Sequence, residues 1–205
     1  MPQLSGTSRG RCKWGPKMNR IMVPTITRWN SRLYLGNGFD AVNVLMLQEK
    51  DITAVANLTN DNMGEKAYGS AYPFKTLVLG QLDGDLIPYV TIDRFLEWMD
   101  ETWAEGHTIF VHCHAGLSRT PSFFIAWLMH RQGCTKETDL RTVWSKWEDQ
   151  IGLRRPIIQP HHKLKSSVVD YFSLRVGAKH YFDDGLKPDV GVFSRQQELE
   201  EIENG

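Results

Sequence analysis

Short apolar runs and longer amphipathic segments alternate along most of the chain. Four apolar runs predict buried strands, and they cover Leu33–Leu35, Ile52–Leu58, Tyr72–Leu79 and Thr108–His112. Apolar residues at helical spacing predict helices over 41–48 with Asp40 as the N-cap, 88–103, 120–131, 135–147 and 161–174. Because strands that alternate with helices form parallel sheets, the pattern predicts an α/β fold. We expect a single domain with a mostly parallel central sheet and helices on both faces.

The same pattern sets the expected limits of this domain. We predict that residues 26–176 form the folded unit, because the regular pattern begins near Ile26 and fades after residue 176. Residues 1–25 are rich in Gly, Ser and basic residues without an apolar period, which predicts a flexible extension. Residues 177–205 turn polar and end in an acidic run, which predicts a tail.

Composition narrows the kinds of partner. The chain has 24 Lys and Arg against 24 Asp and Glu, so no overall field draws it toward nucleic acid or an anionic membrane. The 3 cysteines form an odd set without a Cys-x-x-Cys pair, which argues for a reducing compartment rather than a disulfide scaffold. No apolar run suits a signal peptide or a membrane span. We therefore expect a cytoplasmic protein.

One segment at the end of a predicted strand carries the candidate chemistry. Residues 111–120 read VHCHAGLSRT, so Cys113 follows a strand and Arg119 opens a helix. Ligands of open α/β sheets bind at this edge, beyond the carboxyl ends of the strands. The backbone between these two residues can curl into a cradle whose N–H groups point at an anion, and Gly116 gives the necessary conformational freedom. Arg119 adds a planar cation that can hold two phosphate oxygens.

The same surroundings would activate Cys113 as a nucleophile. A thiol at a helix N-terminus beside an arginine ionises near neutral pH, and a thiolate that faces a phosphate ester attacks phosphorus in line. Thr120 can donate a hydrogen bond to the sulfur and ease its departure in a second step. Taken singly, Cys113 would be a small buried side chain and Arg119 a surface residue. Their combination with Gly116 favours phosphate-transfer chemistry.

The segment resembles the signature of a known enzyme family. His-Cys-x-x-Gly-x-x-Arg-Ser/Thr is the signature of the protein tyrosine phosphatases, and the form at 112–121 is similar to their dual-specificity branch. Further segments resemble the same branch: LYLGN at 33–37, ITAVANLT at 52–59, IAWLM at 125–129 and RPIIQP at 155–160. The resemblance covers 26–174. It implies a protein tyrosine phosphatase-like fold and hydrolysis of phosphotyrosine and phosphoserine/threonine monoesters through a cysteinyl-phosphate intermediate, with no metal or other cofactor.

The resemblance also implies roles for the signature residues. Cys113 would be the nucleophile, Arg119 the phosphate clamp and Thr120 the hydroxyl that assists departure of the sulfur. His112 would support the loop. The phosphate would be bound by the loop residues His114, Ala115, Gly116, Leu117 and Ser118 together with Arg119.

A general acid is implied on the loop before the helix that precedes the signature strand. This aspartate protonates the leaving oxygen and then deprotonates the attacking water. Asp83, within a Leu-Asp-Gly sequence, matches the form and spacing of the family, and Asp85 is the alternative. The other aspartate would serve as a turn residue.

Alternative functions either use the same reaction on another substrate or do not involve phosphate hydrolysis. Phosphorylated proteins are the expected substrates, but the Arg-Thr ending of the signature leaves RNA 5′ phosphates open, and phosphoinositides are a further alternative. A phosphoprotein-binding pseudophosphatase would need a defect in the catalytic machinery. The sequence shows no such defect, because the nucleophile, the clamp, the hydroxyl and the acid are all present. A rhodanese-like sulfurtransferase would lack the Arg119-Thr120 ending and the Asp83 partner.

Overall fold

The computed structural model describes residues 26–61 and 63–175, and the two tails predicted from the sequence lie outside this part. Its strands are β1 (Thr27–Asn30), β2 (Leu33–Gly36), β3 (Ala54–Asn57), β4 (Lys75–Val78) and β5 (Ile109–His112). Its helices are α1 (Gly38–Val42), α2 (Val44–Glu49), α3 (Met63–Tyr68), α4 (Tyr89–Ala104), α5 (Arg119–Arg131), α6 (Leu140–Arg154) and α7 (His162–Ser173), with a 3₁₀ turn at Gly69–Ala71.

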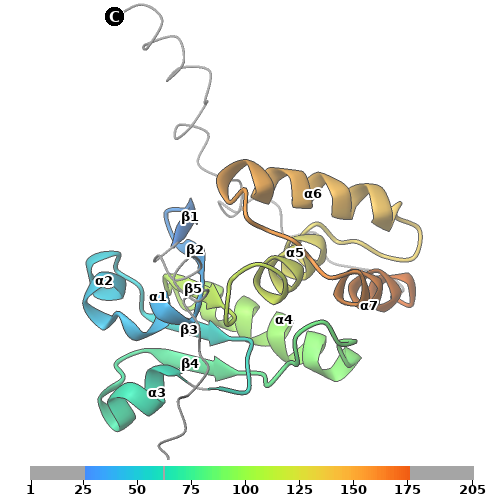
Figure 1. Cartoon of the computed structure of the whole chain (residues 1–205). Coiled ribbons are helices and arrows are strands. Elements are labelled where there is room, and N and C mark those ends of the chain that lie inside the picture. The colour runs from blue at the N-terminus through green and yellow to red at the C-terminus, as the bar shows by residue number, and fades with distance from the viewer. Residues whose placement is uncertain (1–25, 62, 176–205) are drawn as a thin grey trace, which may run out of the picture.

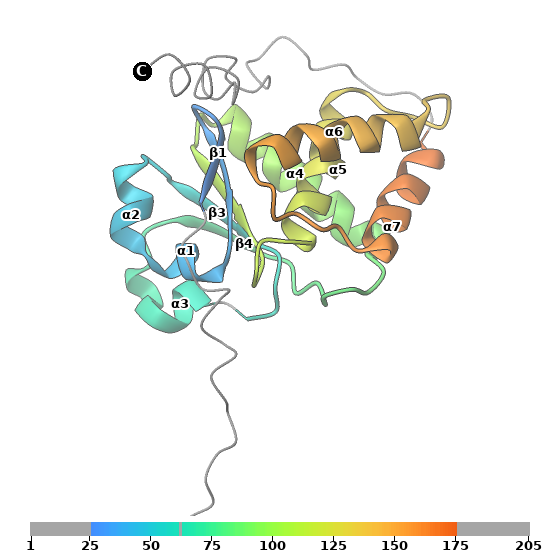
Figure 2. The ribbon, with the colours of Figure 1, turned by 45° about the horizontal axis from the view of Figure 1, so that its top comes forward.

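The strands form one sheet in the order β1-β2-β5-β3-β4. β5 pairs in parallel with β2 on one side and with β3 on the other, and only β1 runs antiparallel to its neighbour. His112, the last residue of β5, lies beside Gly36 and Asn57, the last residues of its two neighbours. The chain therefore leaves β5 at the middle of the carboxyl edge, the edge where α1 begins (Figure 2).

Both faces of the sheet are buried. Alternate strand residues such as Leu35 and Val111 enter a large core with α4, α5, α6 and α7. The residues between them, such as Tyr34 and Phe110, enter a smaller core with α1 and α2. Figure 1 shows the two groups of helices on opposite sides of the sheet. A parallel sheet covered in this way explains why the strands read as nearly continuous apolar runs.

The structure confirms the α/β fold and the four predicted strands, but it corrects two predicted helices. The first helix is capped by Asn37 rather than Asp40, whose carboxylate instead accepts from the Asn37 N–H at 2.8 Å in a capping box. This helix also stops at Asn43, which caps α2 with its own side chain. The helix predicted from residue 135 starts later, because Asp139 accepts from the Thr142 N–H and caps α6.

Two elements were absent from the prediction. β1 is an edge strand of which only Trp29 and Asn30 are buried, and α3 is a short helix without an apolar stripe. Neither has the periodicity that a sequence pattern needs. Within the described ranges, every helix is too short or too polar to cross a lipid bilayer.

Candidate active site

The predicted nucleophile lies at the middle of the carboxyl edge of the sheet. Cys113 directly follows β5, carries a free thiol and has 2% of its surface exposed. The backbone N–H of Gly116 donates to Cys113 Sγ at 3.2 Å, so the chain curls back onto the sulfur. The residues from Cys113 to Arg119 form a tight loop, called the phosphate loop below.

His112 supports this loop from within the sheet. Its Nδ1–H donates to the Cys113 carbonyl at 3.2 Å, and its ring stacks on Phe110. Burial lowers the pKa of His112 to about 4, and the positive charge of Arg119 acts in the same direction. His112 is therefore a neutral hydrogen-bond donor at neutral pH, and its supporting role stays a prediction.

Three carbonyl groups of the phosphate loop are held by groups outside it. The bonds run from Gly38 N to His114 O (3.0 Å), from Arg155 Nε to Gly116 O (3.0 Å) and from Gln159 N to Leu117 O (2.8 Å). A trans peptide places its N–H opposite its carbonyl. The N–H groups of Ala115, Leu117 and Ser118 consequently point away from these partners, to the inside of the loop. Inward N–H groups at the positive end of a helix are suited to binding an anion.

Gly116 is a loop position that admits no side chain. Its φ is +72°, a conformation that L side chains rarely adopt. A Cβ atom there would lie 2.3 Å from Arg155 Nη2 and 2.5 Å from the Gly36 carbonyl oxygen. The curl therefore depends on glycine both for its backbone conformation and for the space behind it.

Arg155, which the sequence analysis did not single out, packs behind the phosphate loop. It is 2% exposed, donates from Nε to Gly116 O and donates from Nη1 to Thr27 Oγ1 at 3.1 Å. Burial lowers the pKa of Arg155, while the negative charge of Asp40, and that of Cys113 when it is ionised, raise it. Arg155 thus brings a positive charge close to Cys113. The feature of the sequence that could have identified Arg155 is the Arg-Pro pair directly after α6, at the start of the segment RPIIQP.

Arg119 and Asp83 meet across the mouth of the loop. Arg119 is the first residue of α5, and 8% of its side chain is exposed. Its Nε lies 3.5 Å from Asp83 Oδ1, and its Nη1 donates to the Gln81 carbonyl at 2.8 Å. The contact with Asp83 is one of charge rather than a hydrogen bond, because Nε makes no hydrogen bond in the described structure. Two predicted site residues from segments far apart in sequence are therefore neighbours.

Asp85, the alternative acid, has a different environment. Its Oδ1 accepts from the Leu86 N–H at 2.9 Å, which is a local turn contact. The segment 80–88, called the acid loop below, folds around the buried amide of Gln81. Gln81 Nε2 contacts the carbonyls of Leu82 (3.0 Å), Asp85 (3.4 Å) and Leu86 (3.2 Å). Of the two aspartates, Asp83 is the one that contacts Arg119, the predicted phosphate clamp.

The start of α7 ties the acid loop to the phosphate loop. The His161 N–H donates to Ser118 Oγ at 3.0 Å. The His161 ring lies beside Gly84, where a Cβ atom would be 3.7 Å from it. Six residues further along the chain, on α7, Ser167 Oγ accepts from the Ile87 N–H at 3.0 Å. Both loops are thereby held by one helix, a role that sequence reasoning missed because it depends on contacts between distant segments.

The remaining predicted residues lie around the same loop. Thr120 is fully buried, and its hydroxyl is 3.4 Å from the Gly36 carbonyl, so its bond to the sulfur stays a prediction. The side chain of His114 is exposed, and those of Ala115, Leu117 and Ser118 are partly buried. In the described ranges, no three His, Cys, Asp or Glu side chains lie together as a possible metal site.

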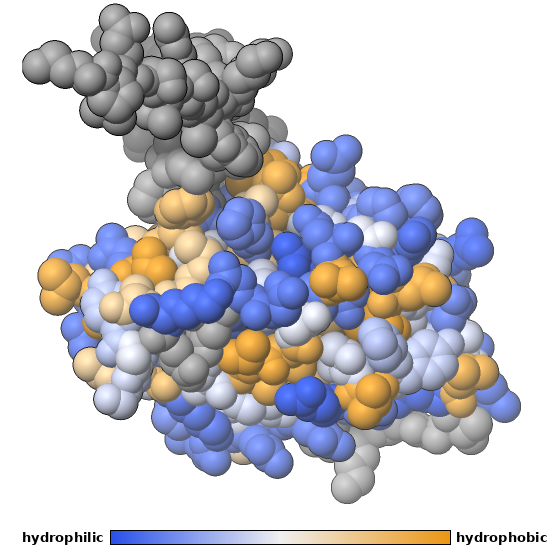
Figure 3. Space-filling model, turned by 60° about the horizontal axis from the view of Figure 1, so that its bottom comes forward, coloured by the Kyte–Doolittle hydropathy of each residue, from blue (hydrophilic) through white to orange (hydrophobic). Residues whose placement is uncertain are grey.

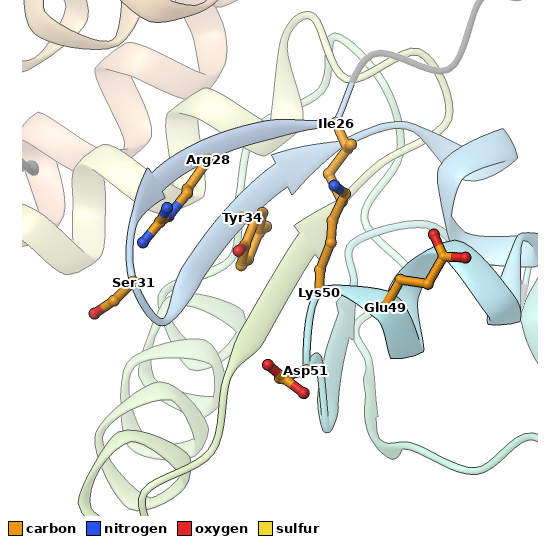
Figure 4. Close-up of a pocket in the computed structure, with 7 residues that line it drawn as sticks. All are labelled: Ile26, Arg28, Ser31, Tyr34, Glu49, Lys50 and Asp51. Carbon is orange, nitrogen blue, oxygen red and sulfur yellow. The ribbon is translucent and has the colours of Figure 1, made fainter. Parts of the chain in front are cut away.

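A hollow of about 440 Å³ lies along β1 and β2, against the end of α2. Figure 4 shows its lining, which runs from Ile26 before β1 to Ser31 and Asp51 in the turns before β2 and β3. None of its lining residues belongs to the phosphate loop or to the acid loop. Its cations, Arg28 and Lys50, are matched by Glu49 and Asp51, so it has no net charge to attract phosphate.

Comparison with known proteins identifies the family of this chain. Residues 33–173 match the family described as dual specificity phosphatase, catalytic domain. The human dual specificity protein phosphatase 8 is 25% identical over 153 residues, which are 74% of this chain and 23% of that protein. Dual specificity protein phosphatase 1 of Arabidopsis thaliana is 29% identical over 130 residues, 63% of this chain and 60% of that protein. This chain thus spans about a quarter of the length of the human protein and three fifths of the length of the Arabidopsis protein.

Solved structures share the fold. The phosphatase domain of Yvh1 from Chaetomium thermophilum superposes with a TM-score of 0.62 at 18% identity, over 74% of this chain and 96% of that one. The likeness shows that this chain has the protein tyrosine phosphatase-like fold that its sequence predicted.

Proposed function

This chain belongs to the family of dual specificity phosphatase catalytic domains, and from that premise we propose that it hydrolyses phosphate monoesters on phosphorylated proteins. Cys113 is the nucleophile, Arg119 the phosphate clamp and Asp83 the general acid and base. The proposal is carried by one arrangement: a phosphate loop with inward N–H groups whose Arg119 faces Asp83 at 3.5 Å. The family match covers residues 33–173. We propose that the catalytic domain extends a little beyond this match at both ends, over residues 26–176.

In the first step, the Cys113 thiolate attacks phosphorus and a sulfur–phosphorus bond forms as the bond to the substrate oxygen breaks. The inward N–H groups and the Arg119 guanidinium stabilise the charge on the equatorial oxygens. Asp83, as the acid, gives its proton to the leaving oxygen, so the product leaves as a neutral alcohol or phenol.

In the second step, water hydrolyses the cysteinyl phosphate. The Asp83 carboxylate takes a proton from the water, the oxygen attacks phosphorus, and Cys113 leaves as a thiolate. Thr120 assists this departure by hydrogen bonding to the sulfur. Inorganic phosphate and free enzyme are the products.

Protein substrates are supported by the charge of the acid loop. Residues 80–90 carry Asp83 and Asp85 and no Lys or Arg. RNA ends and phosphoinositides would bring further negative charge to this loop, and their binding sites are typically basic. The relatives are also named as protein phosphatases.

Cys113→Ser tests the proposal directly. We expect it to abolish release of phosphate from a phosphotyrosine peptide and from an aryl phosphate, because a neutral hydroxyl is a poor nucleophile without an adjacent base. EDTA should leave the wild-type rate unchanged. The matched control is Cys134→Ser: this cysteine is buried, and burial raises its pKa to about 11, so it stays a thiol.

The possible outcomes separate the alternatives. Activity of Cys113→Ser within tenfold of wild type would exclude the thiol mechanism. A wild-type protein that binds phosphopeptides but releases no phosphate would be a pseudophosphatase. Faster release from RNA 5′ phosphates or phosphoinositides than from peptides would replace the protein substrate.

A further inference from the structure

The exposed apolar side chains of the described structure concentrate beside the candidate active site. On the face shown in Figure 3, apolar residues appear in several separate groups among hydrophilic ones. The acid loop and the first turn of α4 differ. There, four large apolar side chains within nine residues are 43–64% exposed: Leu82, Leu86, Tyr89 and Val90. Single exposed leucines are ordinary on a protein surface, but a cluster on one loop marks an interaction surface.

The fold of the acid loop explains why the two leucines stay outside. The carbonyls of Leu82 and Leu86 both turn inward to the buried Gln81 amide. The loop is thereby closed around a polar centre, and Leu82 and Leu86 stay outside it, whereas Ile87 enters the large core. Leu82 is 57% and Leu86 is 59% exposed. Since Leu82 precedes Asp83, which contacts Arg119, this surface borders the phosphate loop.

A further exposed apolar side chain lies in the segment that binds the phosphate loop from the side of α7. Ile157, between α6 and α7, is 47% exposed. Its neighbour Ile158 is fixed by its N–H to the Arg155 carbonyl at 3.2 Å, and the next residue, Gln159, donates to Leu117 O. Exposed apolar side chains therefore occur on two segments that contact the residues of the candidate site.

The charges nearby decide which occupant fits. Asp83 and Asp85 lie between the two exposed leucines, and the segment 80–90 has no Lys or Arg. Asp83 faces Arg119, but in the described structure Asp85 bonds only a backbone N–H. An anionic lipid surface or an RNA strand would meet the Asp85 carboxylate unfavourably, and so would acidic residues beside the phosphorylated one. Neutral apolar residues would bury against Leu82 and Leu86 without that repulsion.

We propose that Leu82 and Leu86 select phosphoprotein substrates that carry large apolar residues, and not acidic ones, next to the phosphorylated residue. This inference rests on the proposed phosphatase function. The contacts with Leu82 and Leu86 select the chain around the phosphate, whereas the phosphate loop binds the phosphate itself.

The test compares three phosphotyrosine peptides of equal length that differ only in the two residues flanking phosphotyrosine: Leu, Ser or Glu. For the wild type, kcat/KM for the Leu peptide should exceed that for the Ser peptide by about tenfold, the factor that partial burial of one leucine supports. The Glu peptide should be the poorest. In the double variant Leu82→Ser with Leu86→Ser, the ratio of Leu to Ser peptide should fall to about 1–2. Ratios on one enzyme preparation do not depend on how much of it is folded.

The matched control is Leu174→Ser. Leu174 is 66% exposed but lies at the far end of α7, so its ratio should equal that of the wild type. Equal kcat/KM for the Leu and Ser peptides in the wild type would overturn the inference, as would a double variant that keeps the wild-type ratio. Preferred hydrolysis of RNA or phosphoinositide vesicles would also overturn it. Failure of the proposed function would look different, because the wild type would then release no phosphate from any peptide or aryl phosphate.

Discussion

At the scale of single residues, Asp83 and Asp85 differ in what their carboxylates contact. Asp83 faces Arg119, whereas Asp85 bonds the N–H of its own neighbour. A general acid must reach the leaving oxygen, which lies near the phosphate and hence near the arginine that binds it. The structure therefore strengthens the assignment of the acid to Asp83, although that role stays a proposal.

Replacing each aspartate tests this assignment. Asp83→Asn should lower kcat on a phosphotyrosine peptide by about 10²–10⁴, the usual contribution of a positioned acid. It should lower turnover far less on an aryl phosphate whose phenolate leaves unaided. Asp85→Asn is the control and should leave this leaving-group dependence unchanged. The assignment is reversed if the dependence appears in Asp85→Asn instead.

His112 makes stability depend on pH. Its pKa is about 4 in the folded protein against 6.5 for the ordinary histidine, so the unfolded chain binds more protons between these values. The free energy of unfolding should consequently be highest above pH 6.5 and fall as pH decreases toward 4, by about 3 kcal/mol for this group.

Urea unfolding at pH 7 and pH 5 measures this effect, with His112→Gln as the comparison. The wild type should lose more of its unfolding free energy over this interval than the variant does. An NMR titration should find the His112 ring neutral down to about pH 5. A ring that titrates near 6.5 would contradict the prediction.

At the scale of elements, the phosphate loop is held by three separate parts of the chain. α1 binds it through Gly38, the end of α6 through Arg155, and the approach to α7 through Gln159. The role of Gly116 in this arrangement can be tested by replacing it with Ala, with a second glycine of positive φ elsewhere in the chain as the control. Gly106 has a φ of +87° and open space where a Cβ would lie.

Gly116→Ala and Gly106→Ala should therefore differ in their effects. Gly106→Ala should lower the free energy of unfolding by about 1–2 kcal/mol, the ordinary strain of a left-handed L residue. Gly116→Ala should lower it further and reduce kcat/KM by at least tenfold, because its Cβ would meet the Gly36 backbone oxygen at 2.5 Å. Denaturant unfolding and aryl phosphate kinetics measure both. Equal losses in the two variants would show that the packing behind the loop is unimportant.

At the scale of the whole molecule, the phosphate loop connects the centre of the sheet to α5. An anion that binds only the folded state raises the free energy of unfolding of the entire domain. Tungstate, a tetrahedral oxyanion, should do so by about 2.7 kcal/mol at one hundred times its Kd. Cys113→Ser should keep this stabilisation, because the N–H groups and Arg119 provide the binding.

Arg119→Lys should lose most of the stabilisation by tungstate, since a lysine ammonium cannot bind two oxygens as the guanidinium does. Thermal unfolding with and without tungstate, against chloride at equal ionic strength, gives the measurement. A Lys variant with the wild-type shift would show that Arg119 does not clamp the anion.

The sequence by itself determined the parts of this protein that depend on local pattern. The parallel strands are apolar on both faces, so their runs were visible, and α5 is buried all around. Cys113, Gly116 and Arg119 are close in sequence, so their spacing alone predicted a loop between a strand and a helix. Local capping was harder to predict: Asn37 and Asp40 both suit a cap, and only their geometry shows that Asn37 begins the helix.

Only the tertiary structure decided which distant residues meet. Three contacts join segments that share no sequence pattern. Asp83 lies beside Arg119, Arg155 packs behind Gly116, and the start of α7 binds both the acid loop and the phosphate loop. Such contacts arise because parallel strands bring their carboxyl ends, and the loops that follow them, to one edge of the sheet. A sequence pattern reports the period of a helix or strand, but the choice among several polar residues at that edge depends on packing in three dimensions.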